Sequence, residues 1–420
     1  MTDAAPQNKL NTKPYKGVRD FYPQDMYVER YIFDTMSRVV ESFGYTEYSA
    51  SILESTELYK NKTSNEIVNE QTYTFTDRGE REVTLRPEMT PTLARMIADR
   101  RNDLTFPLRW YSIPNVFRYE RPQRGRLREH WQLNADLFGV SGIEAEVEMI
   151  SLASELMKTF GAKEDDFEIR ISDRKILTSI FEELSINEEL QTQTIRLLDK
   201  RAKIDDFDLR LEAILSKDAK KFTERLESAS SNVNLEKIIS KLKNLKVTNT
   251  FVDTSIIRGF DYYTGVVFEV FDTSQCNNRS MFGGGRYDNL LKLFGLEPIP
   301  AVGFGMGDVT IYDFLETHDL LPQYAARTEL YLCTLTPEAK EYAQNLAKIL
   351  RKQDVNVEVA FSDKKVGNQI KIADKKKIPF VICIGEDEIK NESFTIKHLD
   401  SGEQTSLDKD SIADYIFSKI

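Results

Sequence analysis

Residues 108–138 decide the fold and read LRWYSIPNVFRYERPQRGRLREHWQLNADLF. The stretch predicts a long β-hairpin whose arms are joined by a basic loop, residues 121–129, with Gly125 in its middle. Because successive side chains of a strand point to opposite faces, Arg118 and Glu120 share one face of the first arm. One face of the return arm carries polar groups from His130, Gln132, Asn134 and Asp136.

If the two polar faces coincide, one side of the hairpin is a floor of charged and amide groups that suits a polar, charged substrate. The alternative is an ordinary antiparallel pair with one solvated face, which is the commoner meaning of polar alternation. The loop favours the first interpretation, because guanidinium groups at the mouth of the floor bind phosphate oxygens in pairs. These guanidinium groups belong to Arg121, Arg124, Arg126 and Arg128.

The string FRYERPQRGRLRE, residues 117–129, followed by Gln132, resembles motif 2 of the class II aminoacyl-tRNA synthetases in the form found in the histidyl-tRNA synthetase family. Three more segments resemble the same family and occur in the family's order. They are TLRPE at residues 84–88, RGFDYYTG at 258–265 and GGGRYD at 283–288. The resemblance covers almost the entire chain.

The composition limits the class of protein. A chain of 420 residues should form two or three domains. A net charge of −11 means that any contact with nucleic acid must rest on local basic patches. The cysteines, Cys276, Cys333 and Cys383, are odd in number and far apart, which argues against a disulfide framework or a zinc site and fits a reducing cytoplasm. Residues 1–17 are expected to be a short disordered lead-in, and no run approaches a membrane span.

Four elements are predicted before the hairpin. An amphipathic helix begins after Gly17 and is closed by Gly44. A strand is predicted at EYSASILES, residues 47–55, and the two together resemble motif 1, the dimer-forming helix and strand of class II synthetases, although Ala50 and Ser51 replace the usual Thr-Pro. A hairpin is predicted over residues 72–85. A further helix is expected to begin after Pro87, with Glu88 in its first turn.

The predicted fold class is α/β, in detail an α+β catalytic domain on a mixed, mainly antiparallel sheet with flanking helices. This domain is expected to comprise residues 1–172 and 248–322, with glycines 283–285 preceding a helix. Residues 173–247 are rich in Leu, Lys and Glu and predict a helical insertion domain, which by the resemblance approaches the acceptor arm of the tRNA. Residues 326–420 alternate strand and helix, predict a small parallel or mixed α/β sheet and resemble the class IIa anticodon-binding domain.

The resemblance implies a homodimeric histidine–tRNA ligase that uses ATP and Mg²⁺. Histidine would be joined to ATP as histidyl-adenylate and then passed to the 3′ end of tRNA(His). Because one anion attacks another, positive charge must be fixed near the α-phosphate, and Arg118 and Arg258 are the predicted catalytic groups. Mg²⁺ would neutralise the outer phosphates, but the sequence identifies no ligands for it.

Three sets of binding residues follow from the resemblance. Histidine is expected to contact Glu88, Gln132, Asp136, Arg258, Tyr262, Tyr263 and Tyr287. The family more often has glutamate at position 136. ATP is expected to contact Arg118, Glu120, Arg126, His130 and Thr310. His130 and Thr310 stand where the family usually has an aromatic and an arginine plate for adenine, and motif 3 reads Val309-Thr310 in place of Glu-Arg. Transfer RNA is expected to contact Gln123, Arg124, Arg128 and Lys371.

Two other functions stay open. One is a catalytically inactive relative, such as the regulatory subunit of ATP phosphoribosyltransferase, against which Arg118, Arg258 and the C-terminal domain argue. The other is an RNA-binding module that kept the pocket as a relic. Histidine-dependent exchange between ATP and pyrophosphate separates both from the enzyme.

Overall fold

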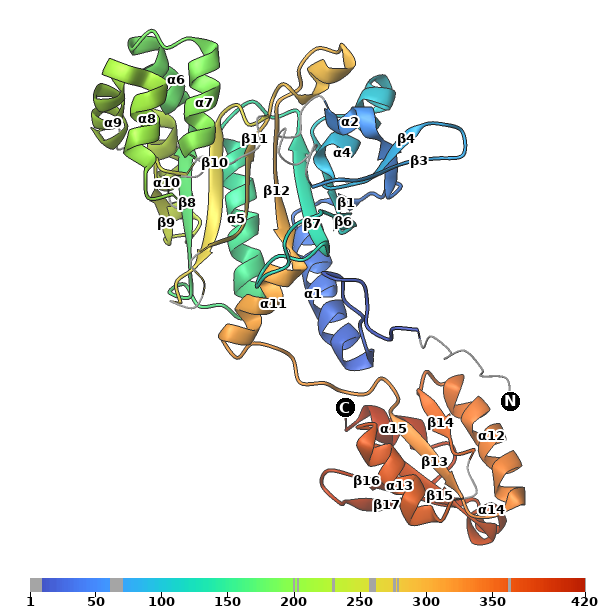
Figure 1. Ribbon diagram of the computed structural model, residues 1–420. Helices are drawn as coiled ribbons and strands as arrows, with labels where there is room; N and C mark the ends of the chain where they lie inside the picture. The colour runs from blue at the N-terminus through green and yellow to red at the C-terminus, as the bar shows by residue number, and fades with distance from the viewer. Residues whose placement is uncertain are drawn as a thin grey trace, which may run out of the picture. The chain divides into compact units, whose positions relative to one another are not determined.

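The structure is a computed structural model, and it describes residues 10–60, 71–198, 201, 204–228, 231–256, 262–274, 277, 279–361 and 364–419. Two compact units are divided after Pro322 (Figure 1). No helix within these described ranges is both long and apolar enough to cross a membrane.

The first unit is organised on a mixed, mainly antiparallel sheet, as predicted. In the part of the chain that the structure describes, this sheet has nine strands in the order β1-β5-β7-β12-β11-β10-β8-β9, with β6 paired to β7. The β1–β5 and β8–β9 pairs are parallel and the other pairs are antiparallel. The bounds are β1 Thr46–Glu47, β5 Leu108–Ser112, β6 Asn115–Phe117, β7 Glu129–Phe138, β8 Phe167–Asp173, β9 Thr250–Val252, β10 Val266–Asp272, β11 Ser280–Arg286 and β12 Ala301–Gly307.

The two faces of this sheet differ in what covers them. Helices α1, α5 and α11 pack on the face to which Leu133, Ala135 and Leu137 of β7 point (Figure 1). The alternate residues of β7, which carry the polar groups, therefore face the other side. There α4 and the 3₁₀ helix η4 pack with Tyr262, Tyr263 and Tyr287. The bounds are α1 Pro23–Ser42, α4 Thr90–Arg100, α5 Glu144–Thr159, α11 Asp308–Thr317 and η4 Leu290–Phe294.

The predicted hairpin is confirmed, with one interruption. Its first arm is split between β5 and β6 around Pro114, and both halves pair with the single long strand β7. Val116 lies opposite His130, and the backbone N–H of Arg118 donates to Arg128 O at 2.9 Å. Since directly opposed residues share a face, Arg118 stands on the polar floor of β7.

Four local predictions are wrong. Residues 47–55 form no single strand, because β1 joins the large sheet and β2 (Leu53–Ser55) joins a separate sheet. Glu88 precedes its helix, since α4 begins at Thr90 with Pro91 in its first turn. Glycines 283–285 lie inside β11 and not in a loop before a helix. The lead-in is ordered from residue 10 onward, and Gly17 O accepts a hydrogen bond from the backbone N–H of Arg128 at 2.7 Å.

A small three-stranded sheet, β2-β4-β3, stands beside helix α2 (Thr56–Lys60). Strands β3 (Tyr73–Thr76) and β4 (Glu82–Leu85) form the predicted hairpin. The register places Leu53, Leu85 and Tyr73 side by side, and Phe75 two residues along on the same face. Leu53 is 44% and Phe75 47% exposed, so this apolar sheet face is only partly covered.

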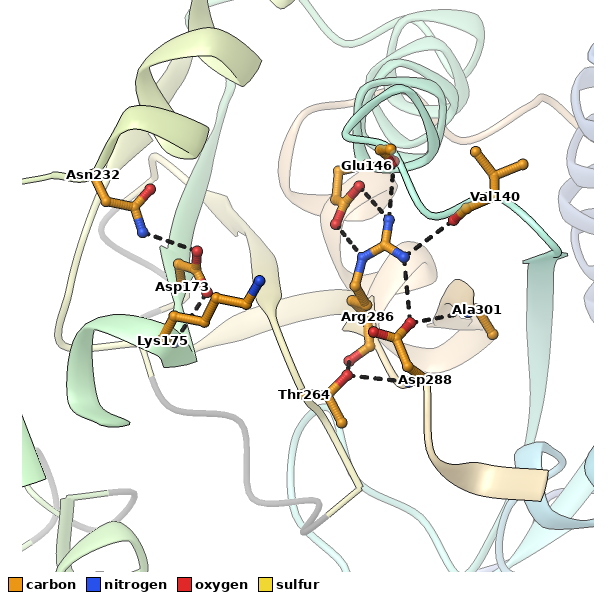
Figure 2. A network of polar contacts seen from close by, with 10 residues as sticks. Val140, Glu146, Asp173, Lys175, Asn232, Thr264, Arg286, Asp288 and Ala301 are labelled. Carbon is orange, nitrogen blue, oxygen red and sulfur yellow. Dashed lines mark hydrogen bonds and ion pairs between the residues drawn. The ribbon is translucent and has the colours of Figure 1, made fainter. Parts of the chain in front are cut away.

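The described residues of the predicted insertion are largely helical, with α6 Arg174–Glu183, α7 Glu188–Leu198, α8 Phe207–Leu215, α9 Ala219–Ser228 and α10 Val233–Asn244. Helices α6 to α9 form a small bundle with a core of their own, whereas the buried residues of α10 pack into the core of the large sheet. The bundle is attached at Asp173, whose carboxylate caps α6 through the N–H of Lys175 at 3.0 Å and accepts a hydrogen bond from Asn232 at 2.9 Å (Figure 2). Asn232 in turn caps α10, so one carboxylate joins the first and last helices of the insertion.

The second unit is the predicted mixed α/β sheet. Its strand order is β14-β13-β15-β16-β17, with β13 parallel to both neighbours and the last two pairs antiparallel. Cys333 and Cys383 are opposed on β13 and β15 as free thiols, and Cys276 lies outside the described residues. The bounds are β13 Leu330–Thr334, α12 Pro337–Arg351, β14 Val357–Val359, α13 Val366–Lys375, β15 Phe380–Ile384, α14 Glu386–Asn391, β16 Ser393–His398, β17 Gln404–Asp408 and α15 Ile412–Phe417.

Candidate active site

Two adjoining cavities lie on the polar face of β7. The smaller has a volume of about 90 Å³ and gathers every described residue of the predicted histidine set. These residues are Glu88, Gln132, Asp136, Tyr262, Tyr263 and Tyr287. The remaining member, Arg258, lies outside the described residues.

Asp136 is an acid of the smaller cavity whose pKa is strongly shifted. It is 3% exposed, and burial raises the pKa of its carboxyl to about 7, although the hydrogen bond from Tyr287 acts in the opposite direction. The hydroxyl of Tyr287 donates to Asp136 Oδ1, while Oδ2 has no partner among the described residues. A buried carboxyl oxygen without a partner is a site for an incoming donor. Tyr262 donates to Glu88 Oε2 at 3.3 Å in the same cavity.

Glycines of the neighbouring strands leave the room that these side chains occupy. Gly303 of β12 lies opposite Asp136, and a Cβ there would stand 2.1 Å from Asp136 Oδ1. A Cβ on Gly305 would stand 2.4 Å from Gln132 Nε2, and one on Gly284 would stand 2.0 Å from Gly303 O. The glycine-rich sequences of β11 and β12 are therefore needed for side-chain space and close strand packing.

Arg286 of the GGGRYD segment fixes the position of its neighbour Tyr287. Its guanidinium forms a two-pronged ion pair with Glu146, at 2.6 and 2.7 Å (Figure 2). Further hydrogen bonds reach Val140 O at 3.1 Å, Gly142 O at 3.0 Å and Asp288 Oδ1 at 3.3 Å. These five bonds match the five N–H donors of a guanidinium, so Arg286 keeps no donor for a substrate.

Thr264 ties this segment to the two tyrosines that precede it in the chain. Its backbone N–H donates to Arg286 O at 2.8 Å, and its hydroxyl accepts from the N–H of Asp288 at 3.1 Å (Figure 2). The rings of Tyr262 and Tyr287 meet edge to face at 5.7 Å. The described part of RGFDYYTG, residues 262–265, and the GGGRYD segment thus build one wall of the cavity together.

The second cavity, of about 280 Å³, contains the whole predicted ATP set: Arg118, Glu120, Arg126, His130 and Thr310. Arg118, Gln132 and Gly305 line both cavities. Arg118 Nε donates to Pro87 O at 2.9 Å, which fixes the plane of the guanidinium at the junction.

His130 and Thr310 stand where the family is expected to have the larger aromatic and arginine side chains that sandwich adenine. Burial, followed by the charges of Arg118 and Arg19, lowers the pKa of His130 to about 3, so its ring is neutral at physiological pH. The hydroxyl of Thr310 donates to Gly307 O at 3.0 Å and is occupied in its own helix. The hairpin loop reaches over this position, since a Cβ on Gly125 would lie 3.8 Å from Thr310 Cγ2. Arg126 pairs with Glu120 at 3.4 Å on the same loop.

The residues expected to contact tRNA lie in different environments. Gln123 and Arg124 are exposed in the hairpin loop, where Arg124 donates to Thr317 Oγ1 at 3.3 Å, and Lys371 is exposed on α13 of the second unit. Arg128, however, is 8% exposed. Its guanidinium donates to Tyr15 OH at 3.0 Å and lies 4.0 Å from the ring centre of Tyr119, which disfavours a contact with tRNA phosphates.

Sequence reasoning did not assign several residues that line the cavities, among them Thr90, Asn134, Glu269 and Ser280. Glu269 had a visible signal, because it interrupts the apolar strand VVFEVF. Asn134 was placed on the correct face of the hairpin but received no role.

Comparisons with known proteins agree with this geometry. A histidyl-tRNA synthetase sequence profile matches residues 17–309, and an anticodon binding domain profile matches residues 329–419. A histidine–tRNA ligase of Leptospira biflexa is 42% identical over 417 residues, which are 95% of this chain and 95% of that protein. One from Thermoplasma volcanium is 38% identical over 410 residues, 93% of this chain and 94% of that protein.

Solved structures of similar proteins share the fold. The histidyl-tRNA synthetase from Nostoc sp. PCC 7120 has a TM-score of 0.81 at 27% identity and covers 98% of this chain and 100% of that one. An ATP phosphoribosyltransferase regulatory subunit/histidyl-tRNA synthetase from Bacillus halodurans C has a TM-score of 0.71 at 23% identity, covering 87% and 97% of the two chains. The second likeness concerns the fold alone.

Proposed function

Because the chain belongs to the histidyl-tRNA synthetase family, we propose that its two adjoining cavities are the subsites for histidine and ATP. The chain is an ATP-dependent histidine–tRNA ligase, which activates histidine as histidyl-adenylate and transfers it to the 3′ end of tRNA(His). The assignment of subsites rests on Arg118, which lines both cavities. The histidine carboxylate and the α-phosphate have to meet where the two subsites join.

The histidine subsite recognises the imidazole through Asp136. The free Oδ2 accepts an N–H of the substrate ring, while Tyr287 holds the other oxygen in place. Glu88, oriented by Tyr262, suits the α-ammonium group. A side chain without a matching donor would leave the buried carboxyl unpaired, at a cost of about 1–3 kcal/mol. Gln132 and Tyr263 complete the walls.

The ATP subsite holds adenine against the neutral ring of His130, because a flat imidazole without charge is a stacking surface. Glu120 accepts from the adenine amino group, and Arg126 faces the phosphates once it leaves its ion pair with Glu120. Thr310 contributes only its methyl group to the pocket, since its hydroxyl is bonded to Gly307 O.

Arg118 supplies the charge that adenylate formation needs. Negative charge builds up at the α-phosphorus when the carboxylate attacks, and a guanidinium already fixed in place pays no reorganisation energy. The bond from Nε to Pro87 O supports such a fixed orientation. Arg258 is the second proposed cation, on the strength of the family signature around it. Loss of one preorganised group of this kind costs about 3–4 kcal/mol.

Mg²⁺ is proposed to accompany ATP. The donor set of the larger cavity fits the ion, because Glu120 and Glu269 both line it, and Mg²⁺ in nucleotide sites is held by one or two carboxylates together with phosphates. When bound, the ion neutralises charge on the outer phosphates.

Transfer RNA is proposed to contact all three domains. Their proposed limits are residues 1–172 with 248–322 for catalysis, 173–247 for the helical insertion and 326–420 for anticodon binding. Gln123, Arg124 and Lys371 are exposed and suit phosphate contacts. Arg128 is the weakest member of the set, because its guanidinium is buried.

A homodimer is proposed. The three-stranded sheet supports this proposal better than α1 does. The buried residues of α1 pack into the core, whereas Leu53 and Phe75 leave an apolar sheet face partly exposed. A second copy of the chain covers such a face in a symmetric dimer. The cytoplasm is the proposed compartment, in keeping with the free thiols of Cys333 and Cys383.

Histidine-dependent exchange between ATP and labelled pyrophosphate tests the subsites directly. The wild-type chain should exchange only when histidine is present, and Arg118→Ala and Arg258→Ala should each lower the rate by roughly a hundredfold or more. Unchanged exchange in Arg118→Ala, with the fold intact, would remove the junction of the two cavities from the mechanism.

A further inference from the structure

An ionic cluster is buried outside both cavities, where α1, β7 and α11 meet. Asp308, the first residue of α11, is 1% exposed. Its Oδ1 accepts a hydrogen bond from the backbone N–H of Trp131 at 2.9 Å, and its Oδ2 pairs with Arg19. Glu29 of α1, 3% exposed, is the second carboxyl of the cluster.

Arg19 is the basic residue of this cluster. Burial, then the neighbouring Asp308, raises the pKa of Glu29 to about 8, so Glu29 is mostly protonated at neutral pH. Within the cluster, Arg19 pairs with Asp308. Removing one partner of a buried ion pair is costly because an uncompensated charge stays behind.

The cluster touches the ATP cavity through the backbone. Trp131 lies between His130 and Gln132, and both of these neighbours line that cavity. Gly307, directly before Asp308, pairs with Gln132 in the sheet. The bond from the N–H of Trp131 to Asp308 therefore joins the start of α11 to the strand segment that carries the His130 ring.

Arg19 belongs to a segment that also contacts the base of the hairpin loop. Gly17 O accepts the backbone N–H of Arg128 at 2.7 Å, and Tyr15 OH accepts from the Arg128 guanidinium at 3.0 Å. Residues 15–19 thus contact Arg128 at the base of the hairpin loop and Asp308 at the start of α11. Glu120 and Arg126 of the ATP cavity lie at this same hairpin loop.

We propose that Arg19 is a positioning residue for ATP: by pairing with Asp308 it holds Trp131, and with it the ring of His130, in the arrangement that binds adenine. Arg19 is not a lining residue of either cavity and acts through Asp308. The inference rests on the proposed ATP subsite.

The test compares Arg19→Ala, Arg19→Lys and a control in ATP–pyrophosphate exchange. Arg19→Ala should raise the KM for ATP about tenfold and change the KM for histidine by less than about twofold, because only the adenine side loses its support. Arg19→Lys keeps the charge and should recover most of the affinity for ATP. The control is Arg109→Ala, which breaks a two-pronged pair with Glu148 (2.8 Å for each bond) outside both cavities. It should leave both KM values unchanged.

Asp308→Asn shows whether a loss of ATP affinity in Arg19→Ala acts through Asp308 or comes from a general folding defect. The amide still accepts from the Trp131 N–H but needs no cation, so the double variant Arg19→Ala/Asp308→Asn should bind ATP more tightly than Arg19→Ala alone. Equal losses of ATP and histidine affinity in Arg19→Ala, or effects of the two substitutions that simply add, would overturn the inference. His130→Ala separates the two proposals: if it leaves the KM for ATP unchanged, the ATP subsite itself is wrongly assigned.

Discussion

Gly303 lies directly opposite Asp136 in the sheet, and a side-chain carbon on Gly303 would stand 2.1 Å from Asp136 Oδ1. Two non-bonded heavy atoms cannot stand that close, so Gly303→Ala must push the Asp136 carboxyl out of its position beside Tyr287. We expect the KM for histidine to rise roughly 5- to 150-fold while the KM for ATP changes little, since a displaced carboxyl costs about 1–3 kcal/mol in recognition. Steady-state exchange kinetics with each substrate varied in turn measure both values.

Gly367→Ala is the matched control for this substitution. A Cβ there meets no atom within 4 Å, and the position is within helix α13, where alanine is the better residue. Activity should equal that of the wild type. If Gly303→Ala retained normal histidine affinity, Asp136 would not be the imidazole acceptor.

The stacking surface for adenine depends on a single ring. His130→Ala should raise the KM for ATP by roughly tenfold or more, because base–aromatic stacking contributes about 1–3 kcal/mol. His130→Phe keeps a flat ring and should remain close to the wild type. The two variants are compared at saturating histidine. A defect of equal size in both would mean that a nitrogen of the ring, and not its plane, binds the nucleotide.

Asp136 should make the stability of the first unit depend on pH. Its pKa is raised from 3.8 to about 7 by burial, so the folded state holds the proton more tightly than the unfolded state does. The free energy of unfolding should therefore fall as pH rises from about 4 to about 7, by roughly 4 kcal/mol at most. In Asp136→Asn this part of the fall should be absent, so the total decline between about pH 4 and 7 should be smaller than in the wild type. Denaturation followed by fluorescence is suitable, because the two tryptophans, Trp110 and Trp131, both lie in the first unit.

Glu29 provides a comparison for that measurement. Its pKa is raised to about 8, so its contribution has the same sign but continues to a higher pH. Glu29→Gln should remove the decline between pH 7 and 8, which Asp136→Asn leaves in place. Identical pH profiles for the two variants and the wild type would exclude both shifts.

Phe75→Glu should weaken the proposed dimer. A carboxylate on the apolar face of the three-stranded sheet would have to be desolvated when a second copy covers it. Light scattering at micromolar concentration should give a dimer for the wild type and a lower mass for the variant. Phe251→Glu is the control, since Phe251 is similarly exposed (51%) but lies on β9 of the large sheet. Dimers of equal strength in both variants would move the interface elsewhere.

The sequence was sufficient for the parts of the fold that depend on local patterns. Alternation along β7 predicted which side chains face the cavities, because a strand with one buried face allows only one register. The family motifs fall into two groups, residues 84–129 and 262–288, which are more than a hundred residues apart, and residues of both groups line the same cavities. Tyr287, directly after β11, and Asp136 of β7, for example, form a hydrogen bond across this separation.

Features set by tertiary contacts could not be read in this way. Residues 47–55 looked like one strand, but β1 and β2 pair with different sheets, and pairing partners leave no local trace. The segment at Gly17 looked disordered because nothing in its own composition shows that Arg128 and Asp308 bind it. The ion pair between Arg286 and Glu146 likewise joins two segments that are distant in the chain, and no local pattern indicates it.

Strand β7 carries His130 near one end and Asp136 near the other, six residues apart on the same face. At about 3.3 Å per residue, a straight strand holds these two groups roughly 20 Å from each other. Neither can drift toward the other without breaking the pairs that β7 forms with β6 at His130 and with β12 at Asp136. The strand therefore sets a fixed distance between the two parts of any ligand that contacts both residues. A bisubstrate inhibitor should show a sharp optimum in linker length, and one too short to reach both groups should gain no more affinity than its better half.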